Sequence, residues 1–194
     1  MLSSLLISKE SMMPYITDYK QKFNDLAYHI ENQDQLRRKA NGGNSILFSY
    51  PPEEESLYIN KALDLYNDTA EFIDISKLFV KFIDEEGWES FKDYYQEFKD
   101  TPYLIFRSDD PSIDLFDLIL NAIEEADKKN KIPMLIRTGS LFGTGIENLN
   151  IMEHKIVMSL NHPLVIFYPS RIVDDNLEFL NCRLASKYRC TLIK

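Results

Sequence analysis

Hydrophobic residues recur along this chain in two patterns, and the first is a one-sided stripe with steps of three and four residues. The clearest stripe lies in residues 10–40, where Tyr19, Phe23 and Leu26 follow one another on one face. Such a stripe predicts an amphipathic helix that packs one face against a core. Stripes and turn signals together predict helices over residues 10–40, 53–67, 77–86, 88–99, 113–129, 147–160 and 177–185. Ser76 is placed to cap the helix that begins at residue 77.

The second pattern is a short, nearly continuous apolar run, which is typical of a strand buried on both faces. Residues 101–112 are ambiguous between a strand and a loop. The predicted strands span residues 46–50, 70–76, 132–139, 163–169 and 188–194. Because these runs alternate with helices, we expect an α/β fold, a three-layer sandwich with a mostly parallel sheet. It would be Rossmann-like or a degenerate P-loop-like fold without a Walker A motif.

The sequence Asn-Gly-Gly-Asn at residues 41–44 divides the chain into two predicted units. These residues tolerate a left-handed backbone, so the first helix is expected to end here. Residues 1–43 are predicted to be an N-terminal helical extension packed on the core. Residues 44–194 are predicted to be a single α/β domain.

Composition and charge narrow the functional classes. The 194 residues are 44% hydrophobic and 27% charged, an ordinary globular balance, with a net charge of −9. Residues 50–126 hold 20 acidic and 6 basic groups. This concentration of negative charge would repel a phosphate backbone, so we expect no direct nucleic-acid binding. It fits either solvated helix faces or a surface that steers a basic protein partner.

Two cysteines, Cys182 and Cys190, are too few for a disulfide framework, and their spacing matches no common zinc site. No apolar run approaches the roughly 20 residues of a membrane span, and the first residues lack the features of a signal peptide. We therefore expect a cytoplasmic protein without membrane contact.

The loop after the first strand is where an α/β protein would bind a phosphate. A phosphate loop needs converging backbone N–H groups and a lysine. This chain instead has Pro51 and Pro52, which lack N–H donors, followed by Glu53, Glu54 and Glu55 at the positive end of the next helix. The loop is thus predicted to start a helix and to exclude a nucleotide, and we expect no cofactor.

A second loop, residues 138–145, contains three glycines, among them Gly139. It lacks a lysine and fits neither common phosphate-binding spacing. It can be a turn that needs a permissive backbone, or an anion-binding nest that also uses Arg137, as in an unusual nucleotide-sensing module.

Three carboxylates, Asp174, Asp175 and Glu178, offer a possible hard-cation site. They would suit a metal-dependent phosphodiesterase or nuclease, the alternative to a non-enzymatic function. The same residues also fit a turn followed by a helix start, which we favour, so no metal site is assigned. No serine or cysteine is tied to a base by local sequence, so no catalytic residue is assigned.

Both buried strands at 46–50 and 163–169 end in Tyr-Pro. Proline should stop each strand and keep the preceding tyrosine extended. We expect Tyr50 and Tyr168 to present their rings at one rim of the sheet, where they would suit a protein contact. The alternative is that both rings simply complete the core.

Several of these segments resemble the BrxB family of BREX (bacteriophage exclusion) defence systems. The matching motifs, in order, are FSYPPEEE at 48–55, TGSLF at 138–142, PLVIFYPS at 163–170 and LEFLNCRLASKYRCTLIK at 177–194. The chain departs from the family pattern at Ser170, where a glycine is expected, in the segment KYRCTLI, and in the loop 139–147, which is poor in the expected aromatic and proline residues. The resemblance therefore leaves open a divergent member or a protein of a related defence island.

The resemblance implies a non-catalytic adaptor of a multi-protein anti-phage system in bacteria. Relatives act alongside an alkaline-phosphatase-like protein, an AAA+ ATPase and a DNA methyltransferase, which are the implied partners. The residues predicted to contact a partner are Tyr50, Pro51, Pro52, Glu53, Arg137, Gly139, Tyr168, Pro169 and Arg171.

Overall fold

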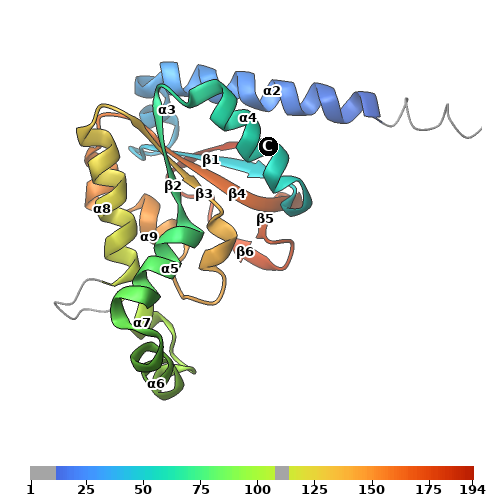
Figure 1. Ribbon diagram of the computed structural model, residues 1–194. Coiled ribbons are helices and arrows are strands. Elements are labelled where there is room, and N and C mark those ends of the chain that lie inside the picture. The colour runs from blue at the N-terminus through green and yellow to red at the C-terminus, as the bar shows by residue number, and fades with distance from the viewer. Residues whose placement is uncertain (1–11, 108–113) are drawn as a thin grey trace, which may run out of the picture.

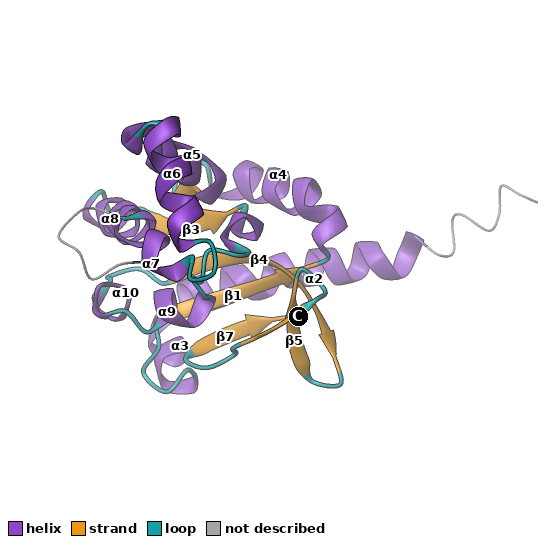
Figure 2. Cartoon of the chain, turned by 90° about the horizontal axis from the view of Figure 1, so that it is seen from below, coloured by secondary structure: helices purple, strands orange, loops and turns teal. Residues whose placement is uncertain are grey.

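The computed structural model describes residues 12–107 and 114–194, and the side chains from residue 19 onward. Five parallel strands form the central sheet in the order β2-β3-β4-β1-β7 (Figure 1). A hairpin, β5 and β6, extends from the end of β4 by antiparallel pairing (Figure 2). The strands are β1 (Ser45–Tyr50), β2 (Ala70–Asp74), β3 (Ile132–Ile136), β4 (Leu164–Val173), β5 (Asn176–Phe179), β6 (Arg183–Ala185) and β7 (Cys190–Ile193).

Helices cover both faces of the sheet, which confirms the predicted α/β architecture, Rossmann-like with a mostly parallel sheet. α2 and α4 lie on one face, and α5, α8 and α9 lie on the other (Figure 1). The helices are α2 (Met12–Glu31), α3 (Gln33–Lys39), α4 (Glu55–Tyr66), α5 (Ile75–Glu86), α6 (Trp88–Phe98), α7 (Tyr103–Phe106), α8 (Leu115–Lys128), α9 (Asn148–Met152) and α10 (Lys155–Ser159).

The two-sided burial of β1 explains why its sequence is apolar throughout. Phe48 packs with Phe23 of α2 and Tyr58 of α4, while the neighbouring Leu47 joins the core under α5 and α8. Successive side chains of a strand point to opposite faces, so each face needs its own apolar set. Ile46, Leu47 and Phe48 are all fully buried.

The predicted helix at 177–185 is wrong, because this segment forms most of the β5–β6 hairpin. Before it, Asp174 and Asp175 form the two-residue turn from β4 into β5, and their φ angles of 48° and 64° are the left-handed pair that such a hairpin turn requires. Leu177 and Phe179 are then buried while Glu178 between them is more exposed, which is the alternation of a strand. The acidic turn was interpreted as a helix start, although it is a strand reversal.

The expectation that Pro169 stops its strand is also wrong. β4 continues to Val173, and Pro169 lies opposite Tyr50, the last residue of β1. The Pro169 carbonyl accepts a 2.9 Å hydrogen bond from the Leu180 amide. The pairing of β4 with β3 ends at Ile166, three residues before Pro169. The missing N–H therefore costs no bond to β3, and the strand can continue into the hairpin.

Four smaller predictions also need correction. The predicted helix at 10–40 is broken at Asn32 into α2 and α3, and the one at 147–160 is divided into α9 and α10. α5 is capped by Asp74, whose carboxylate accepts from the amides of Ser76 and Lys77, and not by Ser76 itself. The ambiguous segment 101–112 forms the short helix α7, and its residues from 108 on lie outside the described part of the chain.

Phe23, Leu26 and Leu36 of the N-terminal helices are buried in the core on one face of the sheet. The boundary between residues 43 and 44 stays a prediction.

Candidate functional site

The carboxyl ends of β1 and β4 lie side by side, at the edge where open α/β sheets bind ligands. The pairing of the two strands sets Ser49 opposite Tyr168 and Tyr50 opposite Pro169. The Ser49 and Ser170 hydroxyl oxygens lie 3.0 Å apart, and the Ser170 hydroxyl donates to the Tyr168 carbonyl at 3.0 Å. These buried hydroxyls bond to each other and to the backbone, and they hold the two strand ends in a fixed relation.

The loop after β1 is short and turns directly into α4. Pro51 keeps an extended backbone, with φ −60° and ψ 129°, and a 3-10 turn at Pro52–Glu54 leads to Glu55, the first residue of α4. Glu53, Glu54 and Glu55 therefore surround the electropositive N-terminus of the helix with negative charge. A phosphate at this position would meet carboxylates where it needs N–H donors.

Tyr50 is fully buried, and its hydroxyl donates a 2.9 Å hydrogen bond to the Glu55 carboxylate. Its ring stacks on Tyr58 with centroids 5.3 Å apart. Burial, and then the neighbouring Glu55 charge, raise the pKa of Tyr50 far above its ordinary value, so the phenol stays protonated.

Tyr168 is also buried, and its ring stacks on Phe179 of the hairpin at 4.7 Å. Burial, and then the charge of Glu147, raise the pKa of Tyr168. The expectation that Tyr50 and Tyr168 present their rings to solvent is therefore wrong. Both rings complete the core, because the helix α4 covers one and the hairpin covers the other.

An open cleft of about 430 Å³ lies beside the β1 loop, between it and the outer end of β4. It brings together four of the predicted partner-binding residues. These are Tyr50, Pro51, Glu53 and Arg171. These four residues from the two strand ends therefore lie around one cleft. Tyr50 is fully buried, so it forms part of the cleft wall and offers no exposed ring to a partner.

The cleft also contains two lysines that were not predicted. Lys22 of α2 is only 7% exposed, and its ammonium group donates to the Ser49 carbonyl at 3.3 Å and lies 5.5 Å from the Tyr58 ring centroid. Lys194 reaches the cleft from the end of β7 and lies 3.6 Å from the Asp175 carboxylate. A signal for Lys22 exists in the sequence, since it lies three residues after Tyr19 and directly before Phe23, on the apolar face of its helix.

Charges of both signs line this cleft. Arg171 bonds Glu178 at 2.7 Å, and Glu53 of the β1 loop is exposed and also lines the cleft. Polar and charged side chains thus make up most of the lining, around Tyr50, Pro51 and Ile172, and a polar, water-accessible surface of this kind is typical of the rim of a protein contact. The arrangement offers neither the N–H cradle of a phosphate site nor a converging carboxylate set.

Arg137 and Gly139 lie at the end of β3, outside this cleft. Arg137 has φ 54° and forms an ion pair with Asp74, the cap of α5. Burial alone would raise the pKa of Asp74, but hydrogen bonds from Ser76 and the positive charge of Arg137 hold it below its ordinary value. Arg137 thus joins the ends of β2 and β3.

The glycine loop has structural reasons for its composition. A Cβ on Gly139 would lie 3.5 Å from the Leu180 side chain and 3.8 Å from that of Pro169, which are ordinary contacts. Gly145 has φ 77°, and a Cβ there would lie 2.5 Å from Cβ of Tyr103. The loop needs glycine to approach α7, which favours the turn over the anion-binding nest.

The proposed cation ligands are engaged elsewhere. Asp175 binds Lys187 at 3.2 Å, and Glu178 binds Arg171. In the described part of the chain, no three His, Cys, Asp or Glu side chains converge as metal ligands would.

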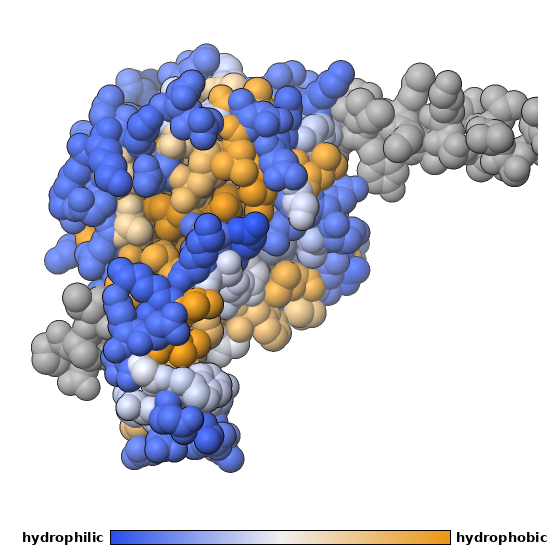
Figure 3. Space-filling model, in the orientation of Figure 1, coloured by the Kyte–Doolittle hydropathy of each residue, from blue (hydrophilic) through white to orange (hydrophobic). Residues whose placement is uncertain are grey.

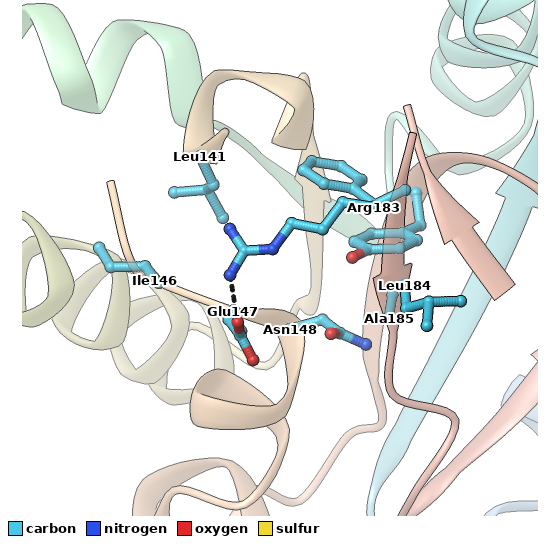
Figure 4. Close-up of a pocket in the computed structure, with 9 residues that line it drawn as sticks. Leu141, Ile146, Glu147, Asn148, Arg183, Leu184 and Ala185 are labelled. Atoms are coloured by element: carbon cyan, nitrogen blue, oxygen red, sulfur yellow. Dashed lines mark hydrogen bonds and ion pairs between the residues drawn. The ribbon is translucent and has the colours of Figure 1, made fainter. Parts of the chain in front are cut away.

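A second pocket lies between the glycine loop, α9 and the hairpin (Figure 4). Leu141 and Ile146 lie along one side of it, and Arg183 reaches across to Glu147 with a 2.5 Å ion pair. Its volume is about 20 Å³, which is room for about one water molecule. This pocket is too small for a ligand.

Comparison with known proteins adds no relative, since neither a protein-family model, nor a curated protein, nor a solved structure matches this chain. The similarity to the BrxB family therefore rests on the motifs and their order alone. Within residues 12–107 and 114–194, no helix has the length and apolar character needed to cross a membrane.

Proposed function

We propose that this protein is a non-catalytic adaptor that binds other proteins through the cleft at the carboxyl ends of β1 and β4. The observation that supports it most is the loop after β1. Pro51 and Pro52 remove N–H donors, and Glu53–Glu55 occupy the helix N-terminus at which a phosphate would bind. The usual ligand position of the fold is taken by the chain's own carboxylates.

The cleft beside this loop supports a protein partner over a small molecule. It is open, and its polar side chains carry both signs of charge, with Glu53 from the β1 loop and Arg171 from the outer end of β4. Pairs of this kind at an interface fix orientation and partner choice. Four other residues predicted to contact a partner would support the cleft surface from behind or beside it. They are Pro52, Gly139, Tyr168 and Pro169.

We further propose that the partners belong to a BREX-type anti-phage system. The support for this step is the ordered set of BrxB-like motifs. These motifs contain seven of the ten residues that line the cleft, while Lys22, Arg171 and Ile172 lie outside them. The candidate partners are an alkaline-phosphatase-like protein, an AAA+ ATPase and a DNA methyltransferase.

Co-purification tests this function directly. The tagged chain is expressed together with the three defence proteins of its own operon, and the proteins retained are identified. Arg171→Glu should reduce retention of one partner at least tenfold, because it reverses a charge inside the cleft.

Arg38→Glu on α3 is the matched control, since Arg38 is also exposed but lies on a helix that leads into the amino end of β1. This control should retain the partner fully, and both variants should keep the wild-type circular dichroism spectrum. Failure of the wild-type chain to retain any of the three proteins would refute the BREX assignment. Equal retention by both variants would refute the role of the cleft.

A further inference from the structure

On helix α6, two exposed aromatic rings lie one on each side of a buried third ring. Trp88 is 62% exposed and Tyr95 is 39% exposed, whereas Phe91 between them is buried. The Trp88 and Phe91 ring centroids lie 6.4 Å apart, and those of Phe91 and Tyr95 lie 5.9 Å apart. Trp88, Phe91 and Tyr95 thus form one continuous aromatic ridge along the helix.

The ridge is held in place from below. The Phe91 ring contacts Phe82 of α5 and Phe106 of α7, each with centroids 6.1 Å away. Both supporting rings are buried. Because the backing is rigid, the exposed rings lose little conformational freedom when a partner covers them.

The position of α6 makes the ridge accessible. Figure 1 shows α6 projecting at the end of the molecule opposite α2. In Figure 3 the surface at this end is a mixture of blue, hydrophilic residues and pale residues of intermediate hydropathy. Trp and Tyr are residue types of intermediate hydropathy. Large exposed aromatic residues are common at the energetic centres of protein interfaces.

The spacing of the ridge indicates the shape of its partner. Positions 88, 91, 95 and 98 are all aromatic and follow steps of three, four and three residues, which sets them along one stripe of the helix. Phe91 and Phe98 of this stripe pack on the protein's own core. Trp88 and Tyr95 therefore form an exposed aromatic seam at its outer side, the part that a second helix would contact.

The charge around the ridge indicates the sign of the partner. Residues 84–100, from the end of α5 through α6, contain seven carboxylates and two lysines. Lys92 is bound to Glu89 at 3.7 Å within the helix. A partner helix would meet a negative rim around an aromatic seam, so it needs lysine or arginine beside its apolar stripe.

We propose that the α6 aromatic ridge binds a basic amphipathic helix of another protein. This surface is separate from the β1–β4 cleft, and the inference does not rest on the function proposed for that cleft. Together, the two surfaces would allow one small protein to join two others.

Tryptophan fluorescence tests the proposal, because Trp88 is the only tryptophan in the chain. The probe is a synthetic helical peptide of leucine and lysine, about 18 residues long so that it can form a helix. Its counterpart has glutamate in place of lysine. The basic peptide should shift the Trp88 emission to shorter wavelength in a saturable way, and added salt should weaken the effect. The acidic peptide should leave the emission unchanged.

A labelled basic peptide then measures affinity by anisotropy. The double variant Trp88→Ala, Tyr95→Ala should weaken binding at least tenfold while retaining Phe91 and the fold. The control is Leu57→Ala, Leu65→Ala on α4, where the side chains are 53% and 49% exposed, and it should change affinity less than twofold.

Three results would overturn the proposal. They are equal affinity of both double variants for the basic peptide, equal binding of the acidic peptide, and self-association of the free chain that the ridge variant abolishes. The last result would assign the ridge to a second copy of this chain.

Discussion

The hydroxyl of Tyr50 donates a 2.9 Å hydrogen bond to the carboxylate of Glu55, joining the last residue of β1 to the first residue of α4. This bond crosses the turn at which nucleotide-binding α/β proteins hold a phosphate. Here the turn is closed on itself by the chain's own donor and acceptor.

Replacing Tyr50 by Phe removes this bond and little else. We expect the free energy of unfolding to fall by about 1–2 kcal/mol, the usual value for a partly buried hydrogen bond to a charged group. Urea denaturation measures the change. Tyr66→Phe at the other end of α4 is the control, since its hydroxyl has no hydrogen bond among the described residues, and it should change stability by less than about 0.5 kcal/mol. Equal effects of the two variants would show that the Tyr50–Glu55 bond contributes nothing.

The ion pair of Asp74 with Arg137 predicts a dependence of stability on pH. The folded-state pKa of Asp74 is lowered, so its contribution is complete above the ordinary pKa of about 3.9 and is lost as pH falls through the lower folded value. Asp74→Asn keeps a capping side chain but loses the charge. We expect it to cost about 1 kcal/mol at pH 7 and progressively less as the pH falls through the folded pKa of Asp74.

Unfolding of both proteins by urea, from pH 7 down to pH 2, measures this difference. Asp127 also has a lowered pKa and titrates in the same range in both proteins, so only the difference between them reports on Asp74. A difference that stays constant with pH would contradict the assignment.

The two-residue turn between β4 and β5 predicts the effect of substitutions at its positions. Asp175 has φ 64°, which glycine adopts without strain, so Asp175→Gly should raise the melting temperature slightly, by the equivalent of about 0.5 kcal/mol. The exposed ion pairs of Asp175 with lysines contribute little. Asp175→Val should lower stability by more than about 1 kcal/mol, because a β-branched residue is strained there. The reverse order of the two variants would be evidence for the helix predicted from sequence.

The two cysteines should differ in reactivity. Burial raises the pKa of the Cys190 thiol to about 12, while Cys182 is exposed. With a disulfide reagent at pH 8, we expect one fast phase from Cys182 and a second phase roughly a hundredfold slower, since the thiolate is the reactive form. Cys182→Ser should remove the fast phase alone. Two equally fast phases would contradict the placement of Cys190 in β7.

Most of the fold could be predicted because buried positions are apolar, and runs or stripes of apolar residues can be seen directly in the sequence. β1, β2, β3 and β7 were each predicted from such runs, and α4, α5, α6 and α8 from stripes. The hairpin was missed because Asp174-Asp175 fits both a helix start and a hairpin turn, and only the left-handed angles of both residues distinguish them.

The site was predictable only in part. The prolines and glutamates of residues 51–55 are contiguous, so their effect on the helix N-terminus could be inferred from sequence. Lys22 and Lys194 reach the same cleft from positions far apart in the chain, and only the fold brings them together. Tyr50 and Tyr168 are buried because α4 and the hairpin cover them. The packing of these elements on the strand ends could not be predicted from any local sequence pattern.

The account depends most on the claim that the β1 loop excludes a nucleotide. Isothermal titration of the full chain with ATP and Mg²⁺ tests it most directly. We predict no saturable heat and an unchanged melting temperature at millimolar nucleotide. Saturable binding that Lys22→Ala abolishes, with the variant still folded, would place a phosphate beside Pro51–Glu55 and contradict the account.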